Sequence, residues 1–276
     1  MGSRETPPSS SDFEEFVMKR RSFLQAAAAT LGSTAVAASA CGAESRKDGV
    51  YELRAYSLKE AKLPILDHYL SKAYLPALKR RGIGPVGVFV EKGDKSPRKV
   101  YVLIVHSSAD QVVTLPASLV EDKAYLKEAA KYLAAPASDP VYERIDSVLL
   151  APIEGMPRLV QPDTAQPRLF NLRIYESHNE RAARKKIEMF NKEELAIFRR
   201  VGLTPVFFAA TVVGAAMPNL TYLLVFPDDA ARLAAWSRFG KDAAWQKLRA
   251  IPEYADKEIV AHITNKILTP TSYSEI

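Results

Sequence analysis

The sequence predicts an α+β fold of two tandem ferredoxin-like units, each running strand, helix, strand, strand, helix, strand. The stretch YELRAY at residues 51–56 returns as FNLRIY at residues 170–175, with Arg and Tyr kept in the same two places. The segments after each copy match one another in order, which indicates an internal repeat. With 276 residues, 47% hydrophobic and 25% charged, the chain is long enough for about two domains with a core each.

Each opening strand is followed by the same succession of segments. A helical segment comes first, KLPILDHYLSKAYLPALKRRG or ERAARKKIEMFNKEELAIFRRVG, and we expect it to end at Gly82 or Gly202. Two β-rich segments follow, GIGPVGVFVE and KVYVLIVHSSAD in the first half, GLTPVFFAAT and LTYLLVFPDDAA in the second. A second helix near residues 125–127 or 245–247 and a last strand near residues 145–150 or 259–268 complete each half.

The same pattern divides the chain into five stretches. The polar, Pro/Ser-rich start is interpreted as a disordered leader, or as lying upstream of the true start if translation begins at Met18 rather than Met1. A proline-rich stretch with few periodic apolar residues joins the halves as a linker. The predicted division is a leader at 1–17, a signal peptide at 18–40, a first domain at 49–153, a linker at 154–167 and a second domain at 168–276.

A basic segment and an uncharged, alanine-rich run precede the repeats. After Met18 the chain reads KRRSFLQ, and the run from there to Ala40 carries no charge. Arg20 and Arg21 ahead of Ser-Phe-Leu resemble a twin-arginine signal peptide. We therefore expect export to the bacterial periplasm or envelope. No later segment is apolar enough to cross a bilayer.

The single cysteine, Cys41, directly follows the small-residue triplet Ala38-Ser39-Ala40. A bacterial lipoprotein signal resembles this pattern and places its acylated thiol here, although Ala38 stands where a larger aliphatic residue is more usual. Two alternatives stay open: a lipid anchor on Cys41, or plain cleavage beside an incidental cysteine. We expect membrane contact only through such an anchor, and one cysteine forms no internal disulfide.

Alternation along the opening strands predicts which side chains share a face. Leu53 and Leu172 belong to the apolar sets, and we expect the helices to cover them. A sheet with helices on one face leaves its other face bare, so the bare sheets should face each other or another chain. The predicted pocket between them contains Arg54, Tyr56, His106, Arg173 and Tyr175.

The roles of these residues stay open between binding and structure. Arg54 and Arg173 present a planar fork that matches a carboxylate or phosphate, but Arg54 could instead pair with Glu52. The two tyrosines suit either an interface or a pocket. His106 is the best acid-base candidate, with Pro227 as its second-half counterpart, and the alternative is a hydrogen-bonded structural histidine.

The ELRxY strand in VYELRAY, the helix running to LKRRGIGPVGVF and the strand KVYVLIVH, with their second copies, resemble the NIPSNAP family over roughly residues 49–276. The second copy departs from this motif by Asn171 in place of Glu52. The resemblance implies paired ferredoxin-like domains of the dimeric α/β-barrel type, with an interaction or small-molecule-binding role. It supplies no catalytic motif that can be carried over.

Composition and missing motifs exclude several function classes. The net charge of +6 is mild and the densest basic runs precede glycines, as helix ends do, so no nucleic-acid partner is expected. The P-loop, GxSxG and HExxH motifs do not occur, and no two histidines have helical metal-binding spacing. No motif implies a cofactor, and we expect no metal site.

Three functional interpretations remain. The preferred one is an exported small-molecule-binding or protein-interaction module with a cavity between two sheets. The second is a dimeric α/β-barrel enzyme, either a cofactor-free oxygenase or isomerase or a haem-dependent one. In the third, the sheets bury one another and leave no pocket. We also expect a homo-oligomer.

Overall fold

The structure is a computed structural model that describes residues 49–93 and 96–276. These residues form one compact unit. The predicted leader and signal peptide, with Arg20, Arg21 and Cys41, lie outside the described residues, so export and acylation stay predictions. Within the described ranges, no helix has the length and apolar character that crossing a bilayer requires.

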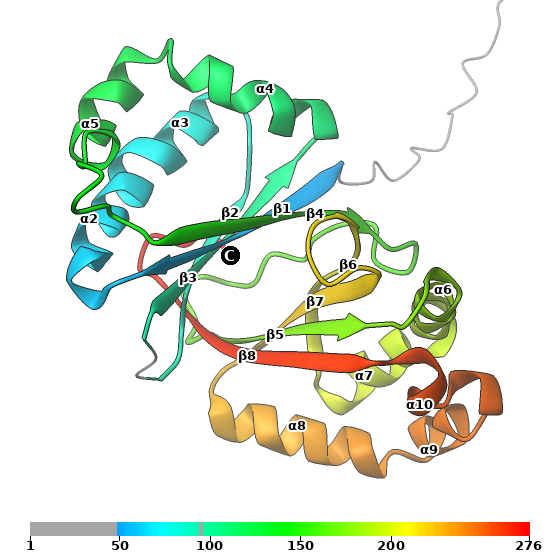
Figure 1. The fold of residues 1–276 in the computed structure, drawn as a ribbon. Coiled ribbons are helices and arrows are strands. Elements are labelled where there is room, and N and C mark those ends of the chain that lie inside the picture. Colours follow the sequence, from blue (N-terminus) through cyan, green and yellow to red (C-terminus); the bar gives the residue numbers. More distant parts are fainter. Residues whose placement is uncertain (1–48, 94–95) are drawn as a thin grey trace, which may run out of the picture. The chain divides into compact units, whose positions relative to one another are not determined.

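Eight strands of the described residues close into a barrel (Figure 1). The order around the barrel is β1-β3-β2-β8-β5-β7-β6-β4, so the four strands of each half are neighbours. The halves meet where β2 pairs with β8 and where β4 pairs with β6, both antiparallel. The strands are β1 (Val50–Leu58), β2 (Val86–Glu91), β3 (Arg98–His106), β4 (Arg144–Pro152), β5 (Leu169–Glu176), β6 (Thr204–Val213), β7 (Asn219–Phe226) and β8 (His262–Pro270).

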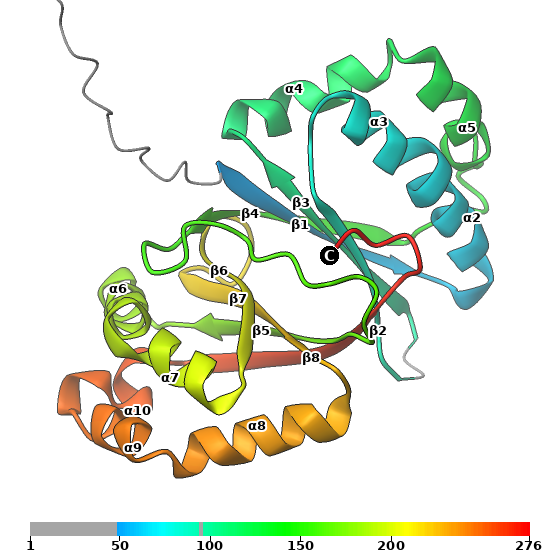
Figure 2. The same cartoon turned by 180° about the vertical axis from the view of Figure 1, so that it is seen from behind.

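The helices lie outside the barrel, those of the first half along one side and those of the second half along the other (Figures 1 and 2). Each half has the predicted order of strands and helices. The first half contains η1 (Glu60–Lys62), α2 (Leu63–His68), η2 (Tyr69–Tyr74), α3 (Leu75–Arg80), α4 (Ala109–Leu119) and α5 (Lys123–Leu133). The second half contains α6 (Glu180–Met189), η3 (Phe190–Glu194), α7 (Leu195–Val201), α8 (Asp229–Lys241), α9 (Ala243–Arg249), η4 (Pro252–Tyr254) and α10 (Asp256–Ile259).

Short polar side chains begin several helices, and glycines follow the predicted helix ends. The first turn of a helix has unpaired backbone N–H groups, which a short side-chain oxygen can accept. Gly202 follows α7 with φ of 85°, and Gly82 follows α3 with φ of 65°, both left-handed as a glycine C-cap allows. The N-cap side chains that accept such a bond are Ser108, Asp122, Asn179, Asp228 and Asp242.

Three apolar clusters hold the barrel and its helices together. One fills the barrel interior and includes Leu53 and Leu172. The second lies between the first-half strands and helices and includes Tyr56. The third lies between the second-half strands and helices and includes Tyr175 and Phe198. Each half therefore has its own core beneath its helices, and both halves share a further core inside the barrel.

The predicted assignment of strand faces is wrong. Leu53 and Leu172 point into the barrel, while Tyr56 and Tyr175 pack beneath the helices. The physical reason is closure: a strand in this barrel is buried on both faces, so apolar residues occupy both and alternation alone does not identify the helix side. The two bare sheet faces line one interior instead of stacking as separate layers.

The last residues of the chain cover one end of the barrel. Beside β2, the backbone N–H of Thr271 donates to the carbonyl of Val88 at 2.9 Å, and the N–H of Glu275 donates to the carbonyl of Val86 at 3.0 Å. Ile276 is fully buried in the interior cluster. A Cβ on Gly87 would lie 2.6 Å from the ring of Phe89 and 3.2 Å from the Cβ of Ile276, so a glycine here leaves room for both side chains.

Candidate functional site

A pocket of about 320 Å³ lies in the barrel interior and draws its lining from both halves. This volume is near the lower end of the range for small-molecule sites, roughly 300–1,000 Å³. The apolar lining includes Leu53, Ala55, Val148 and Leu172. The polar lining includes Lys99, Tyr101, Asp146, Thr221, Thr264 and Lys266. This lining does not include Arg54, Tyr56, His106, Arg173 or Tyr175.

Aromatic side chains fill the barrel beyond the pocket. The rings of Tyr51 and Phe207 meet edge to face with centroids 5.3 Å apart. Those of Phe89 and Phe170 do the same at 4.8 Å. All four side chains are buried, so the barrel is no open channel along this stretch and the pocket is a blind one.

One wall of the pocket contains a charged pair joined to a tyrosine. Lys266 Nζ lies 3.2 Å from a carboxylate oxygen of Glu91, which is itself buried. The hydroxyl of Tyr101 donates to the other oxygen of Glu91 at 3.4 Å. Burial, and then the negative charge of Glu91, raise the pKa of the Tyr101 hydroxyl above its usual range. Tyr101 is therefore a neutral hydrogen-bonding group and no base.

Lys99 differs from Lys266 in its partner. Its ammonium group donates to the hydroxyl of Ser57, its cross-strand neighbour on β1. Among the described residues, no carboxylate forms an ion pair with Lys99. Asp146 lines the same pocket, but its ion pair is with Arg144, at 3.9 Å. The pocket thus combines apolar walls with a lysine whose charge has no ionic partner in the described chain.

Hydrogen bonds fix the turn between β6 and β7 at the pocket. Asn219 Oδ1 accepts bonds from the hydroxyls of Thr211 at 2.6 Å and Thr221 at 3.0 Å. Its amide nitrogen donates to the carbonyl of Ala216 at 2.9 Å. Ala216 lies in the pocket lining with φ of 57°. One asparagine therefore holds both the strand ends and the turn in place.

The predicted residues of the first half form a connected group outside the barrel. Arg54 donates to both oxygens of Glu52, at 2.6 Å from Nε and 3.1 Å from Nη2. His106 Nε2 lies 3.3 Å from Glu52 Oε2. Burial acts to raise the pKa of Glu52, but hydrogen bonds from His106 and Arg54 lower it to about 2. Of the alternatives for Arg54, pairing with Glu52 is therefore the one that the structure contains.

The predicted residues of the second half lie beneath the other helix layer. The guanidinium of Arg173 lies 4.5 Å from the ring of Trp236 and 5.3 Å from that of Tyr175. The hydroxyl of Tyr222 donates to that of Tyr175 at 2.8 Å. Arg173 and Tyr175 thus do not share a face with Arg54 and Tyr56 across a common cavity, because the barrel separates the two helix layers.

Strand register corrects the predicted counterpart of His106. Val50 on β1 and Leu169 on β5 hold the same place in the two repeats. Val50 is paired with His106 on β3, and Leu169 is paired with Phe226 on β7. Phe226, and not Pro227, therefore occupies the matching place. The second half replaces a histidine and a glutamate by Phe226 and Asn171, so the buried ionic group belongs to one half only.

Sequence reasoning missed the polar residues of the barrel pocket, including Lys99 and Lys266. Lys99 alternates with Tyr101 and Leu103 on β3, so the three side chains share a face. We expected that face to lie beneath the helices, and Lys99 was therefore not assigned to a pocket. With the interior face chosen instead, the same alternation indicates a lysine at the end of the barrel.

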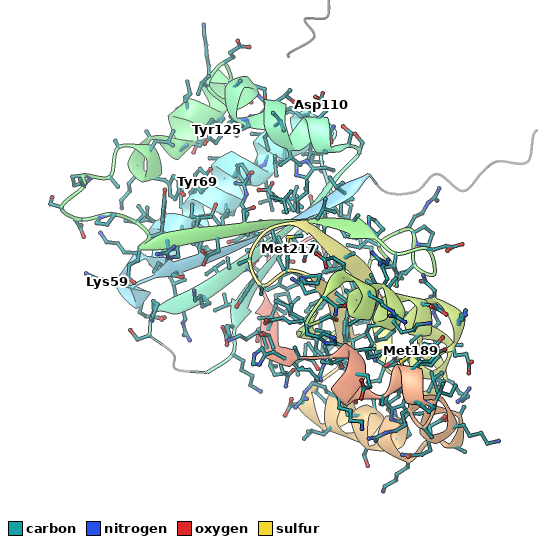
Figure 3. The ribbon with its side chains drawn as sticks, turned by 45° about the vertical axis from the view of Figure 1, so that its right-hand side comes forward. Lys59, Tyr69, Asp110, Tyr125, Met189 and Met217 are labelled. Atoms are coloured by element: carbon teal, nitrogen blue, oxygen red, sulfur yellow. The ribbon has the colours of Figure 1, made fainter. Side chains whose placement is uncertain are left out.

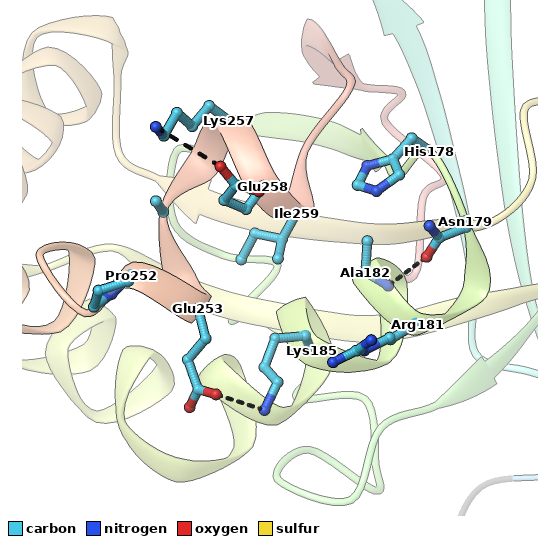
Figure 4. A pocket seen from close by; sticks show the side chains of 11 residues that line it. His178, Asn179, Arg181, Ala182, Lys185, Pro252, Glu253, Lys257, Glu258 and Ile259 are labelled. Atoms are coloured by element: carbon cyan, nitrogen blue, oxygen red, sulfur yellow. Dashed lines mark hydrogen bonds and ion pairs between the residues drawn. The ribbon is translucent and has the colours of Figure 1, made fainter.

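A larger groove of about 730 Å³ lies on the surface between α6 and α10 (Figure 4). Four of its charged groups pair with one another: Lys185 with Glu253 at 3.5 Å and Lys257 with Glu258 at 3.7 Å. The side chain of Asn179 caps α6. Exposed, mutually paired charges are typical of a solvated surface, so volume alone does not make this groove the functional site. In the described part of the chain, no three His, Cys, Asp or Glu side chains gather as metal ligands would.

Solved structures of other proteins share the fold of this chain. A proposed monooxygenase from Lactobacillus acidophilus is 10% identical with a TM-score of 0.53, over 81% of this chain and 94% of its own. One from Fusobacterium nucleatum is 7% identical with a TM-score of 0.53, over 81% of this chain and 93% of its own. At these identities the likeness shows the fold alone. No curated protein sequence matches the chain significantly.

Residues 170–275, in the second half of the barrel, match the NIPSNAP family model. The predicted resemblance to this family is thereby confirmed for that half. A NIPSNAP-like domain protein from Burkholderia xenovorans is 23% identical with a TM-score of 0.35, over 39% of this chain and 88% of its own.

Proposed function

We propose that the barrel pocket binds a compact apolar molecule carrying one anionic group. The observation that carries this proposal is Lys99, a cation in an otherwise largely apolar lining whose charge no carboxylate of the described residues compensates. Lys266 is less available, because Glu91 lies 3.2 Å from it. An anionic group on the ligand would therefore bind on the Lys99 side.

The rest of the lining narrows the ligand further. Leu53, Val148 and Leu172 offer apolar contact on both sides of the barrel, which suits a ring. Asp146 would repel the anionic group and favour a hydrogen-bond donor at another position on the ligand. These features together fit an aromatic hydroxy acid of one ring.

Calorimetric titration with 4-hydroxybenzoate tests the proposal. Lys99→Met should weaken binding roughly 10- to 150-fold, since a charge-assisted hydrogen bond contributes roughly 1.5–3 kcal/mol. Ala55→Leu should weaken it by filling the pocket. The matched control is Lys247→Met on α9, an exposed lysine distant in the fold, which should leave the affinity unchanged. Equal binding by wild type, Lys99→Met and Ala55→Leu would overturn the proposal.

Native mass spectrometry of protein matured in its own host complements the titration. A mass above that of the denatured chain would reveal a retained molecule, and its identity would test the proposed ligand class directly. The same spectrum reads the oligomeric state. A homo-oligomer stays a prediction, and barrel closure removes one reason for it, because each bare sheet face is already covered within the chain.

We infer that each half is a ferredoxin-like unit and that the barrel joins two units of the dimeric α/β-barrel type in one chain. In support, each half has the order last, first, third, second strand within the barrel. The likeness to two proposed monooxygenases does not favour an enzymatic function over a binding function, because it extends to the fold alone.

We also propose export by the twin-arginine route, on the sequence around Arg20 and Arg21. Replacing both arginines by lysine should retain the precursor in the cytoplasmic fraction. An anchor on Cys41 would be supported if Cys41→Ser shifted the mature protein out of the membrane fraction and lowered its mass. An unchanged distribution and mass would remove the anchor from the proposal.

A further inference from the structure

A second pocket, of about 220 Å³, lies on the helix side of the first half and is separate from the barrel interior. Its bottom contains Arg54 of β1, and its walls include Tyr69 and Tyr74 of η2 and Tyr125 of α5. Figure 3 shows Tyr69 and Tyr125 within this helix layer, and their hydroxyl oxygens are 3.2 Å apart.

Apolar side chains surround the entrance of this pocket. Val120, Leu126 and Leu133 line it and are 66%, 38% and 51% exposed. Exposed apolar residues are common singly, but three around one cavity with a buried polar bottom indicate a place where an apolar molecule can enter.

The polar bottom of the pocket keeps unused hydrogen-bonding capacity. Glu52 takes one bond each from two nitrogens of Arg54, and a guanidinium carries five N–H donors. The Arg54 side chain is still 20% exposed despite lying beneath the helices. The hydroxyl of Tyr74, whose ring lies 5.2 Å from the Arg54 guanidinium, is buried without a partner among the described residues.

The charge at the bottom is already compensated. The bidentate pair with Glu52 compensates the positive charge of Arg54. The same Glu52 carboxylate also contacts His106. An anionic ligand would lose its hydration and meet no net positive charge. A neutral acceptor oxygen, in contrast, can take an N–H bond from Arg54 with little desolvation cost.

The size and walls of the pocket define the rest of the ligand. A cavity of roughly 150 Å³ holds a benzene molecule, so about 220 Å³ suits one ring with a short substituent. Tyrosine rings on two sides provide aromatic contact surfaces. We propose that this pocket is a second binding site, which takes a neutral single-ring aromatic molecule bearing a carbonyl oxygen.

Acetophenone and benzoate form a matched pair of probes for this site, because they share a ring and nearly the same shape and differ in charge. Calorimetric titrations are made in the Lys99→Met protein, so that the barrel pocket does not add to benzoate binding. We expect acetophenone to bind with millimolar or better affinity and benzoate to bind about tenfold more weakly or not at all.

Leu126→Trp fills the entrance from a partly exposed position, which spares the buried network. It should weaken acetophenone binding by about tenfold or more. Leu233→Trp on α8, a site 56% exposed in the second half, is the matched control and should leave binding unchanged. The affinity for acetophenone should be equal in wild type and Lys99→Met, which distinguishes this site from the barrel pocket.

Three results would overturn the second site: no saturable acetophenone binding, tighter binding of benzoate than of acetophenone, or equal acetophenone binding by Leu126→Trp and wild type. None of them bears on 4-hydroxybenzoate binding in the barrel. Conversely, a barrel pocket that stays empty leaves the acetophenone measurements fully interpretable.

Discussion

Glu52 Oε2 lies 3.3 Å from His106 Nε2, and both side chains are buried beneath the first-half helices. The other carboxylate oxygen accepts a 2.6 Å bond from Arg54 Nε and a 2.9 Å bond from the Ser147 hydroxyl. One carboxylate therefore satisfies groups from β1, β3 and β4. A buried network of this kind stabilises the fold only while every member keeps its partner.

Replacing Glu52 by glutamine is expected to destabilise the protein by roughly 3 kcal/mol, since it leaves Arg54 as a buried cation without its counter-charge. Chemical denaturation at neutral pH measures this loss. Asp139→Asn is the control, because its pair with Lys62 has a largely exposed carboxylate and should contribute less than about 1 kcal/mol. Equal losses in the two variants would contradict the role given to Glu52.

The stability contributed by Glu52 should depend on pH in a defined window. The folded-state pKa is about 2, below the ordinary value of 4.5, so the unfolded chain binds this proton first. The stabilisation is therefore fully present above about pH 4.5 and is lost as pH falls toward 2, to a total of about 3 kcal/mol. The free energies of unfolding of wild type and Glu52→Gln should converge as the pH falls across this window. A difference that stays constant with pH would contradict the lowered pKa of Glu52.

The repeat and its helix ends could be predicted because they depend on local chemistry. Arg54 and Arg173 stand in the same place of two matching strands, and Gly82 and Gly202 provide the left-handed residue that ends a helix. These signals do not depend on which residues pack against either face of the sheet. For that reason the order of elements in both halves agreed with the structure.

The facing of the strands could not be predicted, because it depends on barrel closure. Leu53 inside the barrel and Tyr56 beneath the helices are both buried apolar side chains, so no polar face marks the outside. Glu52 and Arg54 looked unsuited to a helix-covered face, yet they satisfy one another there. The pocket lysine Lys99 was missed for the same reason.

Lys186 and Glu194 form a second buried ion pair, at 3.0 Å with each side chain 2% exposed. Burial raises the pKa of Glu194, against the opposing effect of Lys186. Lys186→Met should destabilise by roughly 3–5 kcal/mol because it removes that support. The double change with Glu194→Met should recover most of the loss, as measured in a denaturation double-mutant cycle. A loss in the double variant equal to the sum of the two single-variant losses would show that the two charges act independently.

Replacement of glycine by alanine is expected to change stability in opposite directions at two positions. Gly202 has φ of 85°, and an added Cβ would lie 2.8 Å from Arg238 Nη2, so Gly202→Ala should destabilise by about 1–2 kcal/mol. Gly240 lies in α8 with no heavy atom within 4 Å of an added Cβ, so Gly240→Ala should stabilise by up to about 1 kcal/mol.

Thermal and chemical denaturation of both variants decide the matter, and Gly202→Asn separates the two causes of loss at Gly202. Asparagine tolerates the left-handed conformation better than alanine but also carries a Cβ toward Arg238. If backbone conformation dominates, Gly202→Asn should be more stable than Gly202→Ala. If the contact with Arg238 dominates, both should lose similar stability, because the far end of the arginine must move in each case. Stabilisation by Gly202→Ala would contradict both explanations and the assignment of Gly202 as the C-cap of α7.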